Sequence, residues 1–524
     1  MMPNTNADKR DRPILQKIAR RVMQEHGLYP DFSAEALAEL DKLQGPALKV
    51  EQECRDLRNL AWCSIDNDDS LDLDQLTYAR TQDAGDVMAF VAIANVNALV
   101  RKNTALDAHA QYNTTSVYTV AETFPMLPEK LSNGLTSLNL EADRPAVVIE
   151  MRLGPHGALK DSSVYEALVR NRAKLTYNRV SAWLTGAASV PREVTMVRGL
   201  EEAIQLQDTI AQKLKKLRHE RGALELQTVE ARPVFLGDEL KDLQAAGQNR
   251  AQDIIEDFMI AANGVTARFL AAKNFPSIRR VVRVPKRWDR IVALAAERGC
   301  TLPAVPNPKP LDKFLLQQRA ADPVTFPDLS LSVIKLLGAG EYIVEMPGDT
   351  SVGHFGLAVK DYAHSTAPNR RFPDLITQRL LKAAIAGSPL PYTKEELESL
   401  AFHCTEQEDA AKKVERQVEK SAAALLLGKR IGESFDAIVT GVSDKGTWVR
   451  LVNPPVEGKL LSGFGKLDVG NQVRVRLERA NVQRGFIDFR AGASTGKPGA
   501  AGFQHQGQKH QWKKNRNKFR FKKR

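Results

Sequence analysis

An unusually dense group of carboxylates lies near the start of the chain. Residues 65–75 read Ile-Asp-Asn-Asp-Asp-Ser-Leu-Asp-Leu-Asp-Gln. Carboxylates this close repel one another and raise each other's pKa unless a counter-charge neutralises them. Mg²⁺ supplies such a charge, because it prefers oxygen ligands and binds through a few carboxylates together with phosphate oxygens. The spacing therefore indicates a site that holds divalent cations against a phosphate ester.

Two other interpretations of this acidic segment have to be weighed. Acidic loops on soluble proteins are usually just solvated, and a generic acidic run would be best explained that way. A calcium loop of the EF-hand type needs Gly at its sixth position and Glu at its twelfth. Neither is present when the loop is counted from Asp66 or from Asp68. Basic surroundings and matching segments far downstream favour the phosphate-ester site.

The acidic segment matches a known signature, in which Ile-Asp is followed by five residues and then Asp-x-Asp-Asp. Asp66, Asp72 and Asp74 stand in register with that signature, and Gln75 replaces its fourth aspartate. Further matches follow in the same order at 116–118, 124–128, 131–138, 221–224, 255–263, 354–357, 362–375 and 415–416. The chain therefore resembles the catalytic (RNB) domain of the ribonuclease II/R family of 3′→5′ exoribonucleases.

The resemblance implies an activity and a set of catalytic residues. The activity is hydrolysis of single-stranded RNA to nucleoside 5′-monophosphates by two-metal-ion chemistry, with Mg²⁺ as cofactor and Mn²⁺ as a possible substitute. The implied metal ligands are Asp66, Asp72, Asp74 and Gln75. Asp74 matches the family's indispensable carboxylate, and Arg370 matches the arginine that contacts the scissile phosphate, where a guanidinium suits the developing charge.

Gln75 is the departure that leaves a second function open. Its amide oxygen carries no charge, so one metal would be held more weakly, unless Asp68 or Asp69 compensates from the same loop. The alternative is a catalytically impaired RNA-binding protein that keeps the RNB fold. A nonspecific endonuclease is a more distant alternative.

A further set of residues is expected to contact RNA. Tyr118 matches an aromatic that stacks on the 3′-terminal base, although a core tyrosine is the alternative. Leu226 stands where the family has a second stacking residue, a phenylalanine, so the grip on the RNA should be weaker and the end-product length could differ. The predicted RNA-binding residues are Tyr118, Arg370, Arg371, Glu415, Arg416, Arg474 and Arg476.

Composition sets the class of protein. The 524 residues are 43% hydrophobic and 26% charged, which is ordinary for a soluble globular protein of about three domains. The first ten residues contain no apolar stretch of a secretory signal. Residues 87–100 are too short and too interrupted by asparagines to span a membrane. The four cysteines lack zinc or disulfide spacing. We expect a cytoplasmic monomer that binds single-stranded RNA and no membrane, with its protein partners open.

The first 55 residues are predicted to form a small helical module. Residues 14–23 have helical periodicity that ends near Gly27, and Ser33 is placed to cap a second helix over 34–43. Fifty residues are too few for the two β-barrel cold-shock domains that precede the catalytic domain in classical members of the family. A helix-turn-helix-like module and a simple packing appendage are equally open.

Residues 56–428 are predicted to form the α+β catalytic domain that positions the acidic segment. Residues 60–65 read as a strand, followed by the acidic loop and a hairpin return through the apolar run 87–94; 146–153 is another strand. Predicted helices cover 199–221, 249–273, 375–385 and 406–427. Asp253, Glu256 and Asp257 are expected on the polar side of the second helix. Prolines at 303, 306, 308 and 310 mark a loop.

Residues 429–490 alternate short strands with turns and resemble an OB-fold of the ribosomal protein S-one type, a five-stranded barrel that binds single-stranded RNA. Residues 491–524 are predicted to be a disordered basic tail. Nine Lys or Arg and no acidic residue lie in 504–524, so the net charge of +12 falls to about +3 without them. Because aromatics interleave these cations, the tail is predicted to tether RNA.

Overall fold

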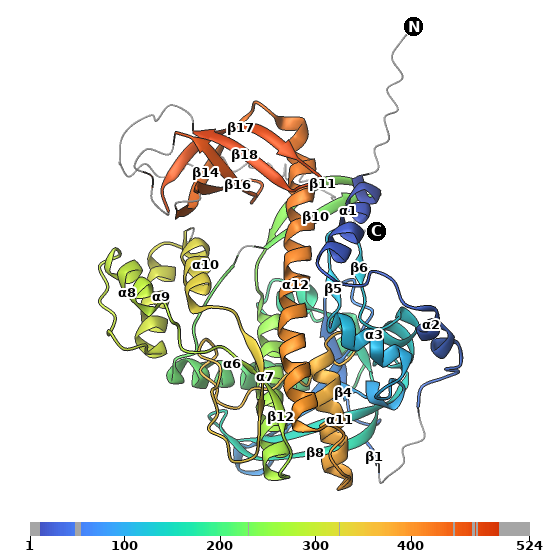
Figure 1. The fold of residues 1–524 in the computed structure, drawn as a ribbon. Helices are drawn as coiled ribbons and strands as arrows, with labels where there is room; N and C mark the ends of the chain where they lie inside the picture. Colours follow the sequence, from blue (N-terminus) through green and yellow to red (C-terminus); the bar gives the residue numbers. More distant parts are fainter. Residues whose placement is uncertain are drawn as a thin grey trace, which may run out of the picture.

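The computed structural model describes residues 11–491 apart from 48–53, 229, 324, 444–445, 464–466 and 468–469. A body of mixed helices and strands carries a closed five-stranded barrel at one end, and the long helix α12 (Lys394–Leu427) runs from one to the other (Figure 1). The predicted class, α+β followed by a small all-β barrel, is confirmed. The predicted basic tail lies outside the described residues.

The core of the body is a seven-stranded sheet in the order β1-β8-β7-β4-β3-β2-β9. Its strands are β1 Arg55–Asp56, β2 Cys63–Asp66, β3 Gln75–Thr81, β4 Val87–Ala94, β7 Asp143–Leu153, β8 Leu159–Arg170 and β9 Ala173–Thr176. Seven of the eight residues of β4 are buried, which explains its unbroken apolar sequence at the centre of the sheet. The strands predicted over 87–94 and 146–153 are confirmed.

The strand that returns from the acidic loop is β3, not the predicted 87–94 segment. β3 pairs antiparallel with β4 along its whole length, from Gln75 opposite Ile93 to Thr81 opposite Val87. It lies between β2 and β4 in the sheet. The sequence analysis missed β3 because Thr77 and Arg80 interrupt the apolar alternation that indicates a strand. The acidic loop is therefore a tight connection between neighbouring strands.

Helices α6 (Leu200–Arg221) and α7 (Arg250–Ala272) lie against this sheet and match the predicted helices. Gly222 ends α6 with φ of +105°, a conformation that glycine adopts without strain. Asp257 of α7 is only 2% exposed and forms an ion pair with Arg218 of α6 at 2.5 Å, so its predicted position on the polar side is wrong. The period of the helix places Asp257 against α6, where an arginine offsets its burial.

Three helices form a separate hydrophobic cluster at the side of the body: α8 Trp288–Ala296, α9 Pro308–Ala321 and α10 Phe326–Leu337. The predicted proline loop is correct for Pro303 and Pro306. Pro308 and Pro310, however, lie in the first turn of α9, where a missing N–H costs nothing. Leu226 packs against this cluster.

Helix α12 has 34 residues and is about 51 Å long. It begins at Lys394, well before the predicted start at 406, because Thr393 and Glu396 form a capping box there. Its buried residues belong to three hydrophobic clusters in turn. Leu397 joins the core of the body, Val414 joins a cluster with α1, and Leu427 joins the core of the barrel.

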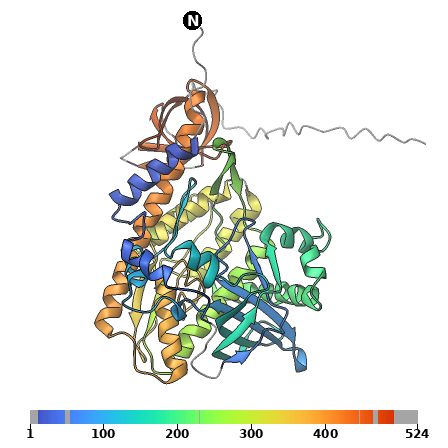
Figure 2. The ribbon, with the colours of Figure 1, turned by 90° about the vertical axis from the view of Figure 1, so that its right-hand side faces the viewer.

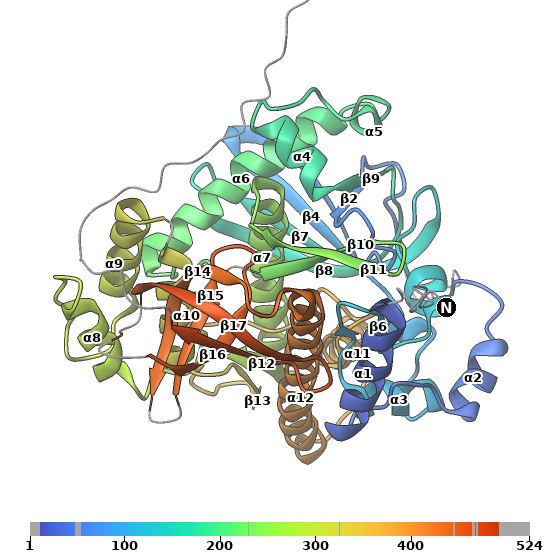
Figure 3. The ribbon, with the colours of Figure 1, turned by 90° about the horizontal axis from the view of Figure 1, so that it is seen from above.

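The N-terminal helices are as predicted. Helix α1 (Asp11–Glu25) packs on α12 near the barrel (Figure 3). Ser33 caps α2 (Ala34–Asp41) by accepting the Ala36 N–H. The remaining elements of the body are the helices α3 Ala105–Asn113, α4 Tyr177–Leu184, α5 Arg192–Thr195 and α11 Phe372–Ala386, and the paired strands β5 Val117–Tyr118 with β6 Thr123–Phe124, β10 Glu230–Leu236 with β11 Glu239–Ala246, and β12 Ser277–Val281 with β13 Glu341–Glu345.

The barrel closes in the order β14-β15-β16-β18-β17 and lies above the body (Figure 2). Its strands are β14 Ser434–Ser443, β15 Gly446–Leu451, β16 Glu457–Ser462, β17 Gln472–Asn481 and β18 Phe486–Ala491. Arg450 of β15 binds Asp328 of α10 through two hydrogen bonds of 3.0 and 2.8 Å, which ties the barrel to the three-helix cluster. Within the described residues, no helix is long and apolar enough to cross a membrane.

Candidate active site

Asp74 is the most deeply placed of the acidic-loop carboxylates. It immediately precedes β3, and its carbonyl oxygen accepts the Ala94 N–H at 2.9 Å, which fixes it against β4. Its side chain is 2% exposed, and Oδ1 accepts the N–H of Asn369 at 3.0 Å. Oδ2 lies 3.5 Å from Nε of Arg370 and has no hydrogen-bond partner among the described residues. One buried carboxylate oxygen is thus left available.

The segment that brings Asn369 and Arg370 to Asp74 is held by a second buried carboxylate. Oδ1 of Asp374, in the first turn of α11, accepts the N–H groups of Thr366 and Ala367 at 2.7 and 2.8 Å. The same oxygen accepts a hydrogen bond of 2.8 Å from Nη2 of Arg371. Arg371, which was predicted to contact RNA, therefore helps to hold this segment in place. The Arg370 side chain, by contrast, is 41% exposed beside Asp74.

Tyr118 connects the acidic loop to α12. Its hydroxyl donates to Oδ2 of Asp72 at 3.3 Å, and its backbone N–H donates to Oε1 of Glu415 at 2.9 Å. Tyr118 is 45% exposed, so it is not the core tyrosine that was the alternative. An exposed ring next to the carboxylates is available for a stacking contact with a base.

The remaining loop aspartates differ in their partners. Oδ1 of Asp66, at the end of β2, accepts the Asn67 N–H at 2.8 Å and the Ser70 hydroxyl at 2.9 Å. Asp68 accepts a 2.7 Å hydrogen bond from Nδ2 of Asn178. Asp69 is exposed and lines the same groove as Asp72. Of the two residues that were considered as compensation for Gln75, Asp69 is therefore the one whose carboxylate faces a ligand space.

Burial and mutual repulsion raise the pKa values of two carboxylates of the site. Burial raises the pKa of Asp74 to about 7; Arg370 opposes this shift, and Asp72 adds to it. Burial likewise raises the pKa of Asp72, with repulsion from Asp66 adding to the shift. Carboxylates in this state are stabilised by a cation. In the described part of the chain, no three His, Cys, Asp or Glu side chains are grouped around one point as metal ligands. The fit to Mg²⁺ therefore rests on the free oxygen of Asp74 and on the repulsion among the carboxylates.

Two hollows open onto this arrangement. A pocket of about 220 Å³ is lined by Tyr118, Arg370, Arg371 and Glu415, which brings four predicted RNA contacts together. A groove of about 850 Å³ runs from Asp72 along β5 and β6 to Arg12 of α1 and Phe235 of β10. Arg416 follows Glu415 on α12 and is exposed, and it lines neither hollow. The site is thus built from the sheet, α12 and the segment before α11.

The predicted barrel contacts lie apart from the site. Arg474 and Arg476 alternate with buried residues of β17, so both face outward from the barrel. Arg474 forms an exposed ion pair with Asp436 at 2.6 Å. These two residues belong to the barrel surface rather than to the pocket at Asp74.

Two residues near the site were not singled out from the sequence. Burial raises the pKa of Tyr177; the Asp66 carboxylate adds to the shift and Arg370 opposes it, so this phenol is within reach of the charges of both residues. Lys174 of β9 donates to the Ser70 carbonyl at 2.6 Å and so holds the acidic loop. Neither residue belongs to a spacing pattern, because β9 and α4 meet the loop only through the parallel pairing of β2 with β9.

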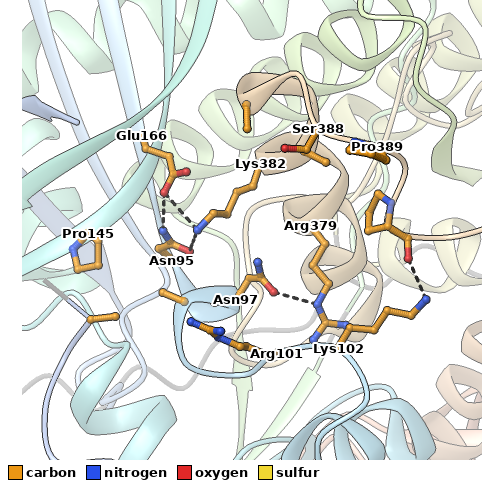
Figure 4. A pocket seen from close by; sticks show the side chains of 15 residues that line it. Asn95, Asn97, Arg101, Lys102, Pro145, Glu166, Arg379, Lys382, Ser388 and Pro389 are labelled. Carbon is orange, nitrogen blue, oxygen red and sulfur yellow. Dashed lines mark hydrogen bonds and ion pairs between the residues drawn. The ribbon is translucent and has the colours of Figure 1, made fainter. Parts of the chain in front are cut away.

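A different cavity, of about 640 Å³, is lined by residues of the segment 95–102 that follows β4, by Glu166 of β8 and by Arg379 and Lys382 of α11 (Figure 4). Most of its cations are bound within the protein. Arg379 binds Asn97 and Asp107, and Lys382 binds Glu166. Arg101 is the exception, because its guanidinium is exposed and has no hydrogen bond or ion pair with a described residue.

Comparison with known proteins agrees with this geometry. A family model described as the RNB domain matches residues 54–387, which is more than half of the chain. The chain belongs to the RNB family. A second family model, described as the RNase II-type exonuclease C-terminal S1 domain, matches residues 433–492 and covers the barrel of this RNB protein. The predicted resemblance is confirmed.

The RNB relatives include ribonuclease R of Escherichia coli strain K12, which is 32% identical over 470 residues, covering 83% of this chain and 57% of that protein. The chain spans about half the length of the curated relatives it matches. Mycoplasma genitalium RNase R in complex with ribose methylated single-stranded RNA has a TM-score of 0.82 at 22% identity, covering 92% of this chain and 78% of that one. Yeast Ssd1, a pseudonuclease, has a TM-score of 0.66 at 16% identity, covering 83% and 54%. At these identities the structures establish the shared fold.

Proposed function

We propose that the protein is an exoribonuclease that hydrolyses single-stranded RNA in the 3′→5′ direction and releases nucleoside 5′-monophosphates. The observation that carries this proposal is the buried Asp74 carboxylate, with one free oxygen, facing the exposed Arg370 at 3.5 Å. Relatives named ribonuclease R support the reaction class, and the RNA-bound Mycoplasma genitalium RNase R supports RNA as the ligand. The expected setting is a monomer in the cytoplasm.

Each residue of the pocket has a distinct part in the proposed reaction. The ring of Tyr118 stacks on the terminal base, and Glu415 orients Tyr118 through its backbone N–H. The Arg370 guanidinium binds the scissile phosphate and stabilises the charge that develops on its oxygens. Asp374 keeps Arg370 in place by binding the N–H groups of Thr366 and Ala367. The groove along β5 and β6 receives the upstream nucleotides.

Mg²⁺ is the cofactor that we propose for this site. Asp66, Asp72 and Asp74 would hold it through carboxylate oxygens, and Gln75 would add at most a neutral amide oxygen. Bound there, the metal supplies charge neutralisation and an activated water for phosphodiester hydrolysis. The raised pKa values of Asp72 and Asp74 support the assignment, because a divalent cation offsets the repulsion that contributes to them.

The proposal is tested with a 5′-labelled oligoribonucleotide in the presence of Mg²⁺, Mn²⁺ or a chelator. We expect a ladder that shortens from the 3′ end, mononucleotide 5′-monophosphates as products, and no reaction with the chelator. A DNA oligonucleotide of the same sequence is the control for RNA specificity. Internal cleavage products, or unchanged RNA under every metal condition, would refute the exonuclease assignment.

Gln75 favours one alternative, an RNB-fold protein that binds RNA without efficient hydrolysis. It removes one anionic ligand from the family signature, and the fold is shared with a protein described as a pseudonuclease. The variant Gln75→Asp separates the two functions. If the wild type is active but limited by metal occupancy, the variant should reach half-maximal activity at a lower Mg²⁺ concentration. An inactive wild type that this substitution makes active would establish the alternative.

A further inference from the structure

A second large cavity lies away from the acidic loop and shares no lining residue with the pocket or the groove around Asp74. Its volume is about 670 Å³, within the range of pockets that hold small-molecule ligands. Its walls come from β7, the turn between β7 and β8, the C-terminal part of α6, the middle of α7 and residues 358–361. No part of the proposed exonuclease reaction uses it.

The walls of this cavity carry more positive than negative charge. Arg218, Arg221, Arg268 and Lys360 line it, against the two carboxylates Asp257 and Asp361. Arg218 is neutralised by its ion pair with Asp257 at 2.5 Å, and Arg268 lies 3.7 Å from Asp361. Arg221 and Lys360 are exposed, and neither side chain has a hydrogen bond or ion pair with a described residue. Two cations are thus left for a ligand.

Arg268 is a strained cation of this cavity. Burial lowers the pKa of its guanidinium; Asp361 opposes this shift, and the charges of Arg279 and Arg221 add to it. Gly264 makes room for this arrangement, because a Cβ at that position would lie 3.3 Å from Nη1 of Arg268. An anionic ligand would offset the repulsion from neighbouring cations in addition to Asp361, which lies 3.7 Å from Arg268.

Much of the remaining lining of the cavity is apolar. Leu214 and Leu217 of α6, Ile260 of α7, and Met151 and Leu153 of β7 line it. A ligand that fills this space must therefore combine a negatively charged group with a flat or apolar portion. A nucleoside monophosphate has both: guanidinium groups bind its phosphate, and its base packs on leucine side chains or on a guanidinium plane.

We propose that this cavity is a nucleoside monophosphate site separate from the candidate active site. Arg221 and Lys360 bind the phosphate, Arg268 contacts the phosphate or the base, and the apolar wall of α6 and β7 holds the base. The site rests on its own residues and would stand if the proposed exonuclease activity failed.

Isothermal titration with AMP, in the presence of a chelator that removes divalent metal from the candidate active site, tests the proposal. The test variant is Arg221→Gln/Lys360→Gln, with Lys360→Gln alone as a milder version. The matched control is Arg101→Gln, which removes an equally exposed and unpaired cation from the 640 Å³ cavity. Arg370→Gln reports on any AMP that binds at the candidate active site. Melting curves of all variants establish that they are folded.

We expect one AMP equivalent that persists in Arg101→Gln and Arg370→Gln and is weakened about 10- to 100-fold in the double variant, because two charge-assisted contacts are lost. Lys360→Gln alone should weaken it about tenfold. Binding unaffected by the double variant, or weakened equally by Arg101→Gln, would overturn the proposal. Inorganic phosphate or adenosine binding as tightly as AMP would overturn the assignment to a nucleotide, since each lacks one half of the recognised chemistry.

Discussion

At the scale of single residues, the Asp74 carboxylate accepts fewer hydrogen bonds than a buried carboxylate with a purely structural role would. A buried carboxylate that only holds the main chain in place is expected to accept several hydrogen bonds. Asp374 has this structural role, because its Oδ1 accepts three hydrogen bonds, although its Oδ2 has no hydrogen-bond partner among the described residues. Asp74 instead accepts one hydrogen bond and faces an exposed arginine, which is the state of a carboxylate awaiting a ligand.

Replacing Asp74 by asparagine should abolish RNA hydrolysis while leaving RNA affinity near that of the wild type. The amide can still accept the Asn369 N–H, so the fold is kept. The lost charge matters most in the transition state, where charge concentrates. Single-turnover rates, together with binding of a non-hydrolysable RNA, measure the two effects separately. Asp68→Asn, in the exposed part of the same loop, is the control and should retain most activity, because the Asp68 carboxylate is already bound by Asn178.

At this scale, the sequence predicted which side chains form the site but not the main-chain groups that hold those side chains in place. Asp66, Asp72 and Asp74 were predicted from a spacing pattern and Arg370 from the family resemblance. The structure places Arg370 3.5 Å from Asp74, although no three carboxylates of the described residues are grouped around one point. The N–H of Asn369, which holds Asp74, has no signal in a sequence, because every residue except proline has an N–H group. Tyr177 could not be found either, since its position depends on the pairing of β2 with β9.

At the scale of elements, a histidine links α6 to α9. His219 lies 3.3 Å from Asp312 and 3.2 Å from Glu225, and hydrogen bonds to these carboxylates raise its pKa to about 9. In the unfolded chain its pKa is about 6.5. A raised folded-state pKa stabilises the fold fully below pH 6.5, and this stabilisation is lost as the pH rises through 9. The contribution at low pH is about 3 kcal/mol at most.

We therefore expect His219→Gln to lower the melting temperature clearly at pH 6 and by much less at pH 9.5. Melting curves of wild type and variant across this range measure the difference. His156 is exposed, and His156→Gln should melt like the wild type at every pH. A difference between His219→Gln and wild type that stays constant with pH would show that the histidine acts through packing rather than charge.

Elements with strong local signals were predicted well, and those determined by tertiary contacts were not. Helix α6 ends at Arg221 as predicted, and the Ser33 cap is confirmed, because caps act within a few residues. Strand β3 was missed because its half-buried polar residues are stabilised by pairing with β4. Asp257 was placed on the wrong face because its partner, Arg218, lies 39 residues away.

At the scale of the whole molecule, the Arg450–Asp328 pair joins the barrel to the three-helix cluster. The side chain of Asp328 is 5% exposed and that of Arg450 is 16% exposed, so removing the arginine leaves a buried charge unpaired. Arg450→Met should destabilise the protein by about 3 kcal/mol or less, measured from the midpoint of urea unfolding. Arg474→Met is the control, because its pair with Asp436 is exposed and should contribute under about 1 kcal/mol.

The basic tail lies outside the described residues, and its function remains a prediction from the sequence. Deleting residues 492–524 keeps β18, which ends at Ala491. Because each phosphate neutralised by the tail releases counterions, the deletion should weaken binding to long single-stranded RNA at low salt and flatten the dependence of log affinity on log salt. Turnover of saturating short RNA should be unchanged. Equal salt slopes for the full-length and shortened proteins would exclude a tether.

Helix α12 takes part in three hydrophobic clusters, one of which it shares with the barrel. None of these clusters can lose its packing without exposing apolar side chains of the same helix, and a helix propagates order along its length. The RNB domain and the C-terminal barrel should therefore not melt independently. We expect a single endotherm in scanning calorimetry, with a calorimetric enthalpy close to the van't Hoff enthalpy, which is the behaviour of one cooperative unit rather than of two linked domains.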